Sequence, residues 1–207
     1  MNSERILVVK RECLFTEKPF TGLMSEQRTD SQQHYASLIN EHKEFLPRDL
    51  MEQDARYKQI IPYLVFTHKD SYFLMQRCAR ASESRLQSKF SLGIGGHIRQ
   101  EDVRDSDIFA WARREFYEEV HYEGSLEVNF VGIVNDDSTE VGKVHAGFVF
   151  LLEGDSPHIS VKTELAHGQM LTLMDCASYV DRMESWSVLV HNYLSINRFC
   201  GSLEKTS

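Results

Sequence analysis

Three glutamates stand close together in the middle of this 207-residue chain, at Glu115, Glu118 and Glu119. A helix advances by about 100° per residue, so these positions fall within one arc of roughly 100° on one helix face. Carboxylates crowded in this way repel one another, and a bound divalent cation relieves the repulsion. The spacing therefore indicates a site for a hard divalent metal, although a solvated charged helix face has the same pattern.

Two neighbouring features favour the metal site. Gly95 and Gly96 precede the acidic segment, and a turn made of glycines can bring backbone carbonyl oxygens close to the helix. Arg114 stands directly before Glu115, and its guanidinium group can hold a carboxylate in place. These features favour an oxygen-ligand metal site, while the spacing alone leaves a solvated charged face open as the alternative.

These residues resemble a known motif. The run REFYEEV at 114–120 resembles the R-E-U-x-E-E-x core of the Nudix box, where U is a bulky apolar residue, and GGH at 95–97 resembles its leading glycine. The complete pattern is G-x5-E-x7-REUxEExGU. Its first glutamate falls on Ser106 and its final glycine is His121 here. About four residues are inserted between the glycine and the arginine.

A broader resemblance extends from about Glu44 to Leu152. The segments FLPRDLMEQDARYKQIIPYLVF, SLGIGGHI and VGKVHAGFVF, with Arg85 and Lys89 between them, are similar to a bacterial subgroup described as predicted Nudix phosphoesterases. This resemblance implies an α/β protein with the Nudix fold, an α/β/α sandwich with a mixed β-sheet and the box helix packed against it.

The resemblance also implies an activity, that of a Nudix-type diphosphate hydrolase that depends on Mg²⁺ or Mn²⁺. The expected substrate is a small phosphorylated molecule, a nucleoside diphosphate linked to another group. Glu115 and Glu119 match the principal metal ligands, with Glu118 as a further ligand or nearby acid and the Gly96 carbonyl completing the set. Arg114 would orient Glu115, and Arg114, Glu115 and Glu118 are the expected catalytic residues. Metals held there would neutralise the diphosphate and activate a water for attack on phosphorus.

Several other side chains could contact the substrate. Basic residues near the glycine segment could bind phosphates, two histidines could donate hydrogen bonds, and a late glutamate could supply the extra acid that many Nudix enzymes bring from a loop. Solvated or purely structural roles stay open for each of them. These candidates are Arg77, Arg85, Lys89, His97, His145 and Glu164.

The inserted residues are predicted to form a surface loop over 99–105, because their polar composition has no helical apolar period. Asp105 or Ser106 offers a better start for the helix. The acids at Glu101, Asp102 and Asp107 are expected to serve loop solvation and helix capping.

Two alternative functions remain open on the sequence. A non-catalytic Nudix-like domain could sense a nucleotide or mediate an interaction, but retention of the three glutamates disfavours it. An isomerase acting on an isoprenoid diphosphate would need a cysteine near SLGIGGHI. No cysteine lies between Cys78 and Cys176, so we disfavour the isomerase.

Amino-acid composition limits the binding partners and the cellular compartment that can be expected. The formal net charge of −8 disfavours general nucleic-acid or anionic-membrane binding, and no apolar run approaches the roughly 20 residues of a membrane span. The four cysteines are widely spaced, which excludes a usual cysteine zinc cluster and disfavours a disulfide scaffold. We expect a soluble cytoplasmic protein, with a homodimer left open.

The elements that must position the acids follow from periodicity. We expect one compact domain, with an N-terminal extension at 1–56 packed on a Nudix domain at 57–200. A loop is predicted over 24–30. Predicted strands cover 6–10, 60–68, 72–77, 91–98, 126–134 and 146–152, and predicted helices cover 31–45, 107–122, 174–181 and 186–199.

Overall fold

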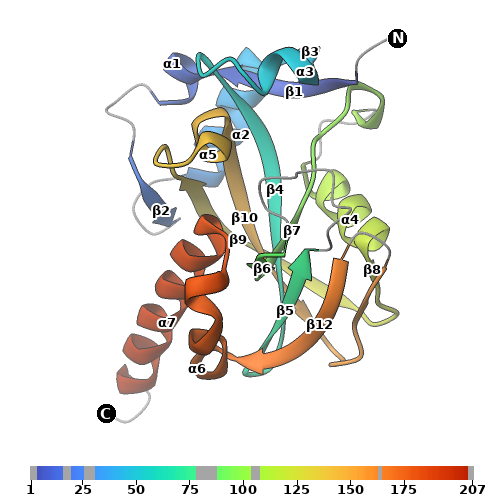
Figure 1. Ribbon diagram of the computed structural model, residues 1–207, viewed down its shortest axis with the longest axis vertical. Helices are drawn as coiled ribbons and strands as arrows, with labels where there is room; N and C mark the ends of the chain where they lie inside the picture. The colour runs from blue at the N-terminus through green and yellow to red at the C-terminus, as the bar shows by residue number, and fades with distance from the viewer. Residues whose placement is uncertain are drawn as a thin grey trace. The chain divides into compact units, whose positions relative to one another are not determined.

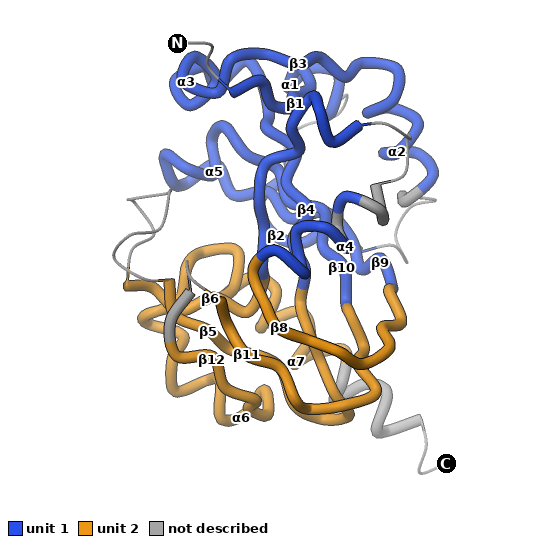
Figure 2. The backbone as a smooth tube through the Cα atoms, turned by 90° about the vertical axis from the view of Figure 1, so that its right-hand side faces the viewer, with its two compact units in different colours: residues 1–64, 94–118, 129–151 blue, residues 65–93, 119–128, 152–207 orange. Residues whose placement is uncertain are grey.

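The structure is a computed structural model of the chain. It describes residues 4–15, 20–25, 31–77, 88–103, 108–162 and 165–204. The chain divides into two compact units, coloured separately in Figure 2. Unit 1 comprises residues 1–64, 94–118 and 129–151, and unit 2 comprises residues 65–93, 119–128 and 152–207.

Most strands belong to one ten-stranded sheet, whose main path runs β12-β5-β4-β10-β9-β2 (Figure 1). Valine, isoleucine, phenylalanine and tyrosine are frequent in these strands and suit a pleated, buried surface. Three strands of the sheet each contribute residues to both units. They are β4 (Tyr57–His68), β9 (Leu126–Asn135) and β10 (His145–Gly154).

Unit 1 contains the N-terminal strands and the acidic helix. Its strand β1 pairs antiparallel with β3 and with the start of β4, in registers that include Ile6↔Leu46 and Val8↔Gln59. The other elements mostly or wholly within unit 1 are β1 (Arg5–Lys10), α1 (Arg11–Leu14), β2 (Gly22–Ser25), α2 (Ser31–His42), β3 (Glu44–Pro47), α3 (Arg48–Met51), β7 (Gly93–Gly95), a 3₁₀ turn (Gln100–Asp102), α4 (Ile108–Glu119) and α5 (Glu140–Val144).

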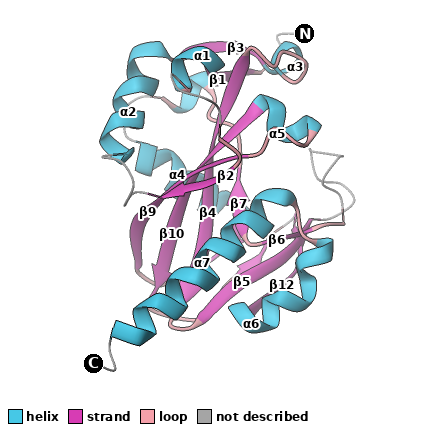
Figure 3. Cartoon of the chain, turned by 90° about the vertical axis from the view of Figure 1, so that its left-hand side faces the viewer, coloured by secondary structure: helices cyan, strands magenta, loops and turns pink. Residues whose placement is uncertain are grey.

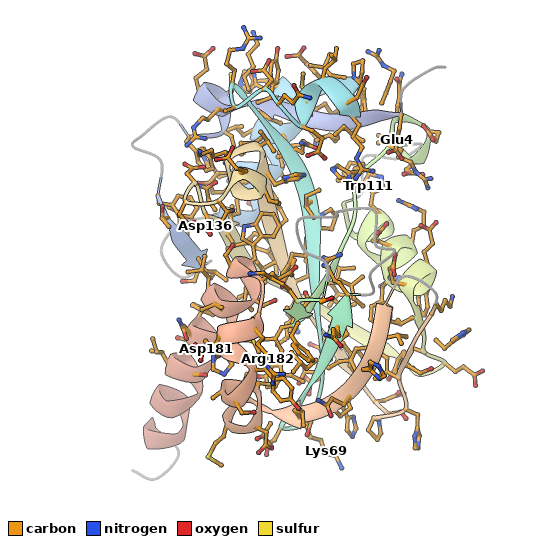
Figure 4. All side chains as sticks on the ribbon, in the orientation of Figure 1. Glu4, Lys69, Trp111, Asp136, Asp181 and Arg182 are labelled. Atoms are coloured by element: carbon orange, nitrogen blue, oxygen red, sulfur yellow. The ribbon has the colours of Figure 1, made fainter. Side chains whose placement is uncertain are left out.

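Unit 2 contains the C-terminal helices and the antiparallel pair of β5 and β12, which includes Phe73↔Met170. The helix α7 (Ser185–Glu204) is the longest helix among the described residues (Figure 3). The side chain of Arg182 lies over the rings of Phe90 and Tyr179, 5.0 Å from each centroid (Figure 4). The elements of unit 2 are β5 (Ser71–Arg77), β6 (Phe90–Ser91), β8 (Val120–His121), β11 (Ser160–Val161), β12 (Leu165–Thr172), α6 (Leu173–Cys176), a 3₁₀ helix (Ala177–Arg182) and α7 (Ser185–Glu204).

Local sequence explains where several elements begin and end. The β4–β5 hairpin turns at Lys69, whose φ of 52° is left-handed. The helix α5 starts at Thr139, whose hydroxyl accepts a hydrogen bond from the Gly142 amide at 2.9 Å, an N-cap contact that satisfies an otherwise unpaired helix amide. Arginine and glutamate favour helix in α4. That helix ends at Glu119, because the next two residues form β8 and pair with β11.

The structure confirms the predicted strands at 6–10, 60–68 and 72–77, and the acidic helix, with small shifts of their ends. Four predictions were wrong in detail. The helix expected over 31–45 ends at His42, and Glu44 and Phe45 belong to β3, which pairs with β1. The strand expected over 91–98 consists of the short β6 and β7, and the helix expected over 174–181 is α6 followed by a 3₁₀ helix. Met24, placed in a loop, belongs to β2 and pairs with Ile133 of β9.

Over its described part, the inserted segment does not continue helix α4. Within residues 99–103 a single 3₁₀ turn spans Gln100–Asp102, which agrees with the loop prediction, while 104–107 lie outside the described residues. None of the helices among the described residues is both long and apolar enough to cross a membrane.

Candidate functional site

The helix α4 carries the acids that the sequence singles out. Its buried side includes Trp111, labelled in Figure 4, and Phe116, which is fully buried. Glu115 follows Arg114 one turn before the end of the helix, and its side chain is 13% exposed. Glu118 is half exposed, so the helix presents one sheltered carboxylate and one that reaches solvent.

The Glu115 carboxylate sits directly against Gly96. A Cβ atom added at residue 96 would overlap with Glu115 Oε1, so only glycine leaves room for the carboxylate in this position. The backbone of Gly96 is thereby held next to an acid that lies nineteen positions later in the sequence. The role of the Gly96 carbonyl as a metal ligand stays a prediction.

Arg114 ties the acids together. Its guanidinium group donates to Glu118 Oε2 at 2.6 Å and to Asp102 Oδ2 at 2.9 Å, and it lies 3.5 Å from Glu115 Oε2. Asp102 also accepts from Arg99 Nε at 3.0 Å. One arginine therefore orients acids from α4 and from the 3₁₀ turn of the insertion.

Asp102 is a member of the site that sequence reasoning missed. Burial by itself would raise the pKa of Asp102, but hydrogen bonds from Arg99 and the charge of Arg114 outweigh it and hold the pKa below its usual value. Its side chain is 8% exposed, so it is a buried ionic partner of Arg114 and not a solvated loop acid. The sequence of a polar insertion does not predict this ion pair, because no local pattern indicates which of its acidic side chains will be buried.

Glu119 is the last residue of α4, and its side chain is partly buried. Its backbone carbonyl accepts a hydrogen bond from the Lys162 amide at 2.8 Å within unit 2. This bond fixes the backbone of Glu119 where the helix gives way to β8. The role of its carboxylate as a metal ligand stays a prediction.

The two predicted histidines meet in unit 1. The Nε2 atoms of His97 and His145 lie 3.3 Å apart, and His97 Nε2 is 2.7 Å from Gln59 Oε1. Burial, the charge of Arg48 and the proximity of His145 hold the pKa of His97 well below its usual value, so its ring is neutral at pH 7. The sequence named both histidines but gave no reason to place them together.

The basic candidates are described only in part. Arg77 forms an ion pair with the buried carboxylate of Glu184, 3.1 Å from Nε to Oε2, and its backbone amide donates to the Lys89 carbonyl. The Lys89 side chain is exposed. Arg85 lies outside the described residues, and phosphate binding by Arg77, Arg85 or Lys89 stays a prediction. Glu164, the candidate for the extra acid from a late loop, also lies outside the described residues.

The donor set of the acid cluster fits a hard divalent cation. The cluster contains more carboxylates than guanidinium groups to neutralise them. The missing side chain of Gly96 leaves space in which the Glu115 carboxylate lies against the backbone. Oxygen donors of this kind are those that Mg²⁺ and Mn²⁺ prefer. Within unit 1, Glu115 and Glu118, with the Gly96 carbonyl, are the residues that could hold such an ion.

Comparison with known proteins identifies the family. No family model matches the chain. The chain is 32% identical to the protein YmaB of Bacillus subtilis over 205 residues, which cover 92% of this chain and 97% of YmaB. It is 31% identical to Tm1382, named as a candidate Nudix hydrolase, whose crystal structure matches with a TM-score of 0.78 over 92% of this chain and 98% of Tm1382.

This chain belongs to the Nudix hydrolase superfamily. The predicted Nudix fold, with its mixed β-sheet and helices, is thereby confirmed. A more distant fold match is a bifunctional NMN adenylyltransferase/ADP ribose pyrophosphatase from Francisella tularensis, complexed with AMP and a manganese ion. It is 15% identical, with a TM-score of 0.50 over 83% of this chain and 51% of that one.

Proposed function

We propose that this chain is a metal-dependent hydrolase that cleaves the diphosphate linkage of a nucleoside diphosphate joined to another group. The observation that carries the proposal is the Glu115 carboxylate, seated against the glycine backbone and tied through Arg114 to Glu118 and Asp102. A solvated charged face would need neither the glycine nor the partly buried arginine–aspartate pair.

The residues would divide the work in the following way. Glu115, Glu118 and Glu119, with the Gly96 carbonyl, would hold Mg²⁺ or Mn²⁺, which when bound neutralises phosphate charge and lowers the pKa of water. Arg114 keeps Glu115 and Glu118 in fixed orientations, so little reorganisation is needed when the substrate binds. Asp102 keeps the guanidinium group of Arg114 in place from the other side.

A nucleotide-derived substrate is supported by family membership and by the Francisella protein, whose complex contains AMP and manganese. The group attached to the diphosphate depends on the side chains that line the substrate pocket. Arg77, Arg85, Lys89 and Glu164 are proposed as candidates for those contacts.

The test is a screen of nucleoside diphosphate derivatives with the full-length chain, supplemented with Mg²⁺ or Mn²⁺ and coupled to a phosphatase that releases phosphate from the products. We expect turnover of at least one derivative, its loss on chelation and its return on adding either metal. Glu115→Gln should abolish turnover, while the matched exposed variant Glu123→Gln should not.

Full turnover after exhaustive chelation would rule the mechanism out. Thermal stabilisation by a nucleotide derivative without turnover of any would instead favour the non-catalytic, ligand-sensing function.

A further inference from the structure

A second cluster of potential metal ligands lies in unit 1. Glu52, which follows α3, His97, which follows β7, and His145, the first residue of β10, each bring one ligand atom within 4.8 Å of the others. His97 Nε2 is 3.3 Å from His145 Nε2 and 4.0 Å from Glu52 Oε1. Three segments far apart in the sequence therefore converge on one point.

Hydrogen bonding fixes the state of His145. Its Nδ1 atom lies 2.7 Å from the Val141 carbonyl oxygen, which can only accept, so Nδ1 carries the hydrogen. The Nε2 atom of the neutral ring therefore presents a lone pair toward His97. The backbone carbonyl of His145 accepts from Lys58 Nζ at 3.2 Å, so the residue is held at both its ring and its main chain.

The ring of His97 is surrounded by acceptors. The Gln59 amide donates through Nε2 to the Met51 carbonyl, which turns its Oε1 atom toward His97 Nε2 at 2.7 Å. His97 Nε2 therefore carries the hydrogen when no ion is bound, and Gln59, His145 and Glu52 direct electron pairs toward it. A cation can replace that single proton, with His97 binding as its Nδ1–H tautomer.

The distances suit a transition metal. Two nitrogen ligands of a tetrahedral ion with bonds of about 2.0–2.1 Å lie roughly 3.3 Å apart, which matches the separation of the two Nε2 atoms. Glu52 is 22% exposed and 3.6 Å from Arg48 Nε, and a small shift of its carboxylate away from Arg48 would bring it onto the ion. Two imidazoles with one carboxylate favour Zn²⁺ over Mg²⁺, which prefers oxygen ligands.

This cluster is distinct from the acids of α4. Residue 96 faces Glu115, whereas the next residue, His97, contacts Gln59 of β4 and His145 of β10. The glycine segment thus separates the two sets of ligands, one made of oxygen and the other mainly of nitrogen.

We propose that Glu52, His97 and His145 form a binding site for one divalent transition-metal ion, with Zn²⁺ the best fit, separate from the acidic cluster of α4. Gln59 offers a fourth donor through its amide oxygen. Bound there, the ion would tie β4 and β10 to the residue that follows Gly96 and so stiffen the glycine segment on which Glu115 rests.

The experiment uses the full-length chain stripped of metal and titrated with Zn²⁺ in excess Mg²⁺, which occupies oxygen sites. We expect one Zn²⁺ per chain by calorimetry, a higher melting temperature, and X-ray absorption that shows scattering from two imidazoles. Glu52→Gln, at a partly exposed position, should keep the fold and weaken Zn²⁺ binding by at least about tenfold, as should His97→Asn.

Two controls separate the sites. His158→Gln removes an exposed histidine and should leave Zn²⁺ binding unchanged, and so should Glu115→Gln. The proposal is overturned if no Zn²⁺ binds stoichiometrically above Mg²⁺, or if Glu52→Gln and His97→Asn bind it as tightly as the unaltered chain. Loss of binding in Glu115→Gln would also overturn it, because the ion would then sit on α4.

Discussion

The absence of a side chain at Gly96 makes room for the carboxylate of Glu115. A Cβ at residue 96 would overlap with Glu115 Oε1, whereas a Cβ at Gly95 would lie 2.9 Å from the backbone oxygen of Pro62. A side chain at residue 96 is therefore opposed by the flexible side chain of Glu115, whereas a side chain at residue 95 is opposed by the backbone of β4.

Gly96→Ala should separate activity from stability. The new methyl group pushes aside the end of the Glu115 side chain, which can rotate away, so the melting temperature should change little. Turnover should fall by at least about tenfold, because a ligand displaced by about 1 Å no longer meets the metal. Gly95→Ala is the contrasting variant and should lower the free energy of unfolding by about 1–3 kcal/mol. Wild-type turnover in Gly96→Ala would show that the position of Glu115 is irrelevant.

Glu119→Gln tests whether the last acid of α4 is a ligand. The change keeps the volume and removes one negative charge, so stability without metal should stay level or rise slightly. Turnover at saturating Mg²⁺ should drop by at least about a hundredfold, roughly 2.7 kcal/mol of transition-state stabilisation. A folded variant within about threefold of the original turnover would refute the ligand assignment; a solvated acid would shift stability by no more than about 0.5 kcal/mol.

Arg114→Lys should expose the positioning role of the guanidinium group. Lysine keeps the charge but has a single nitrogen, whereas the guanidinium group contacts Glu118 through Nη1 and both Asp102 and Glu115 through Nη2. We expect the Mg²⁺ concentration for half-maximal turnover to rise several-fold, with a weaker effect in Asp102→Asn. An unchanged metal dependence, with only the melting temperature lowered, would mean that Arg114 is purely structural.

Cys176 should be unreactive in the folded chain. It is fully buried in unit 2, and burial together with the charge of Asp175 raises its pKa to about 11. At pH 8 the reactive thiolate is therefore about a thousandth of the total, and the fraction grows only as the pH approaches 11. Mass spectrometry after brief iodoacetamide treatment at pH 8 should find Cys13, which is partly exposed, labelled well before Cys176.

Unfolding in urea is the control for this labelling, since both cysteines should then react at similar rates. Rapid labelling of Cys176 in the native chain would show that α6 opens readily.

The sequence was informative where contacts are local. Helix geometry alone places Glu118 within reach of Arg114, four positions earlier, and the same 3.6-residue period separates the buried Phe116 from the acids. The hairpin of β4 and β5 follows from two apolar runs and a short polar turn, which the pairing His68↔Ser71 bears out. The Nudix motif then led from this helix to the family.

The sequences of β2 and β12 gave no local signal for a strand. The strand β2 exists because β9 offers it an edge, and residues 165–172 form β12 by pairing with β5. Such partners depend on register across the whole sheet, and a short mixed polar sequence does not specify its register by itself.

By itself, the sequence determined the acidic helix, the arginine beside it and the oxygen-ligand chemistry that these imply. Only the tertiary structure decided that Asp102 turns inward to Arg114 and that Glu52 and Gln59 meet His97 and His145. The physical reason is chain separation: contacts within one helical turn are fixed by backbone geometry, whereas contacts between distant residues exist only after strand pairing and burial have chosen one arrangement.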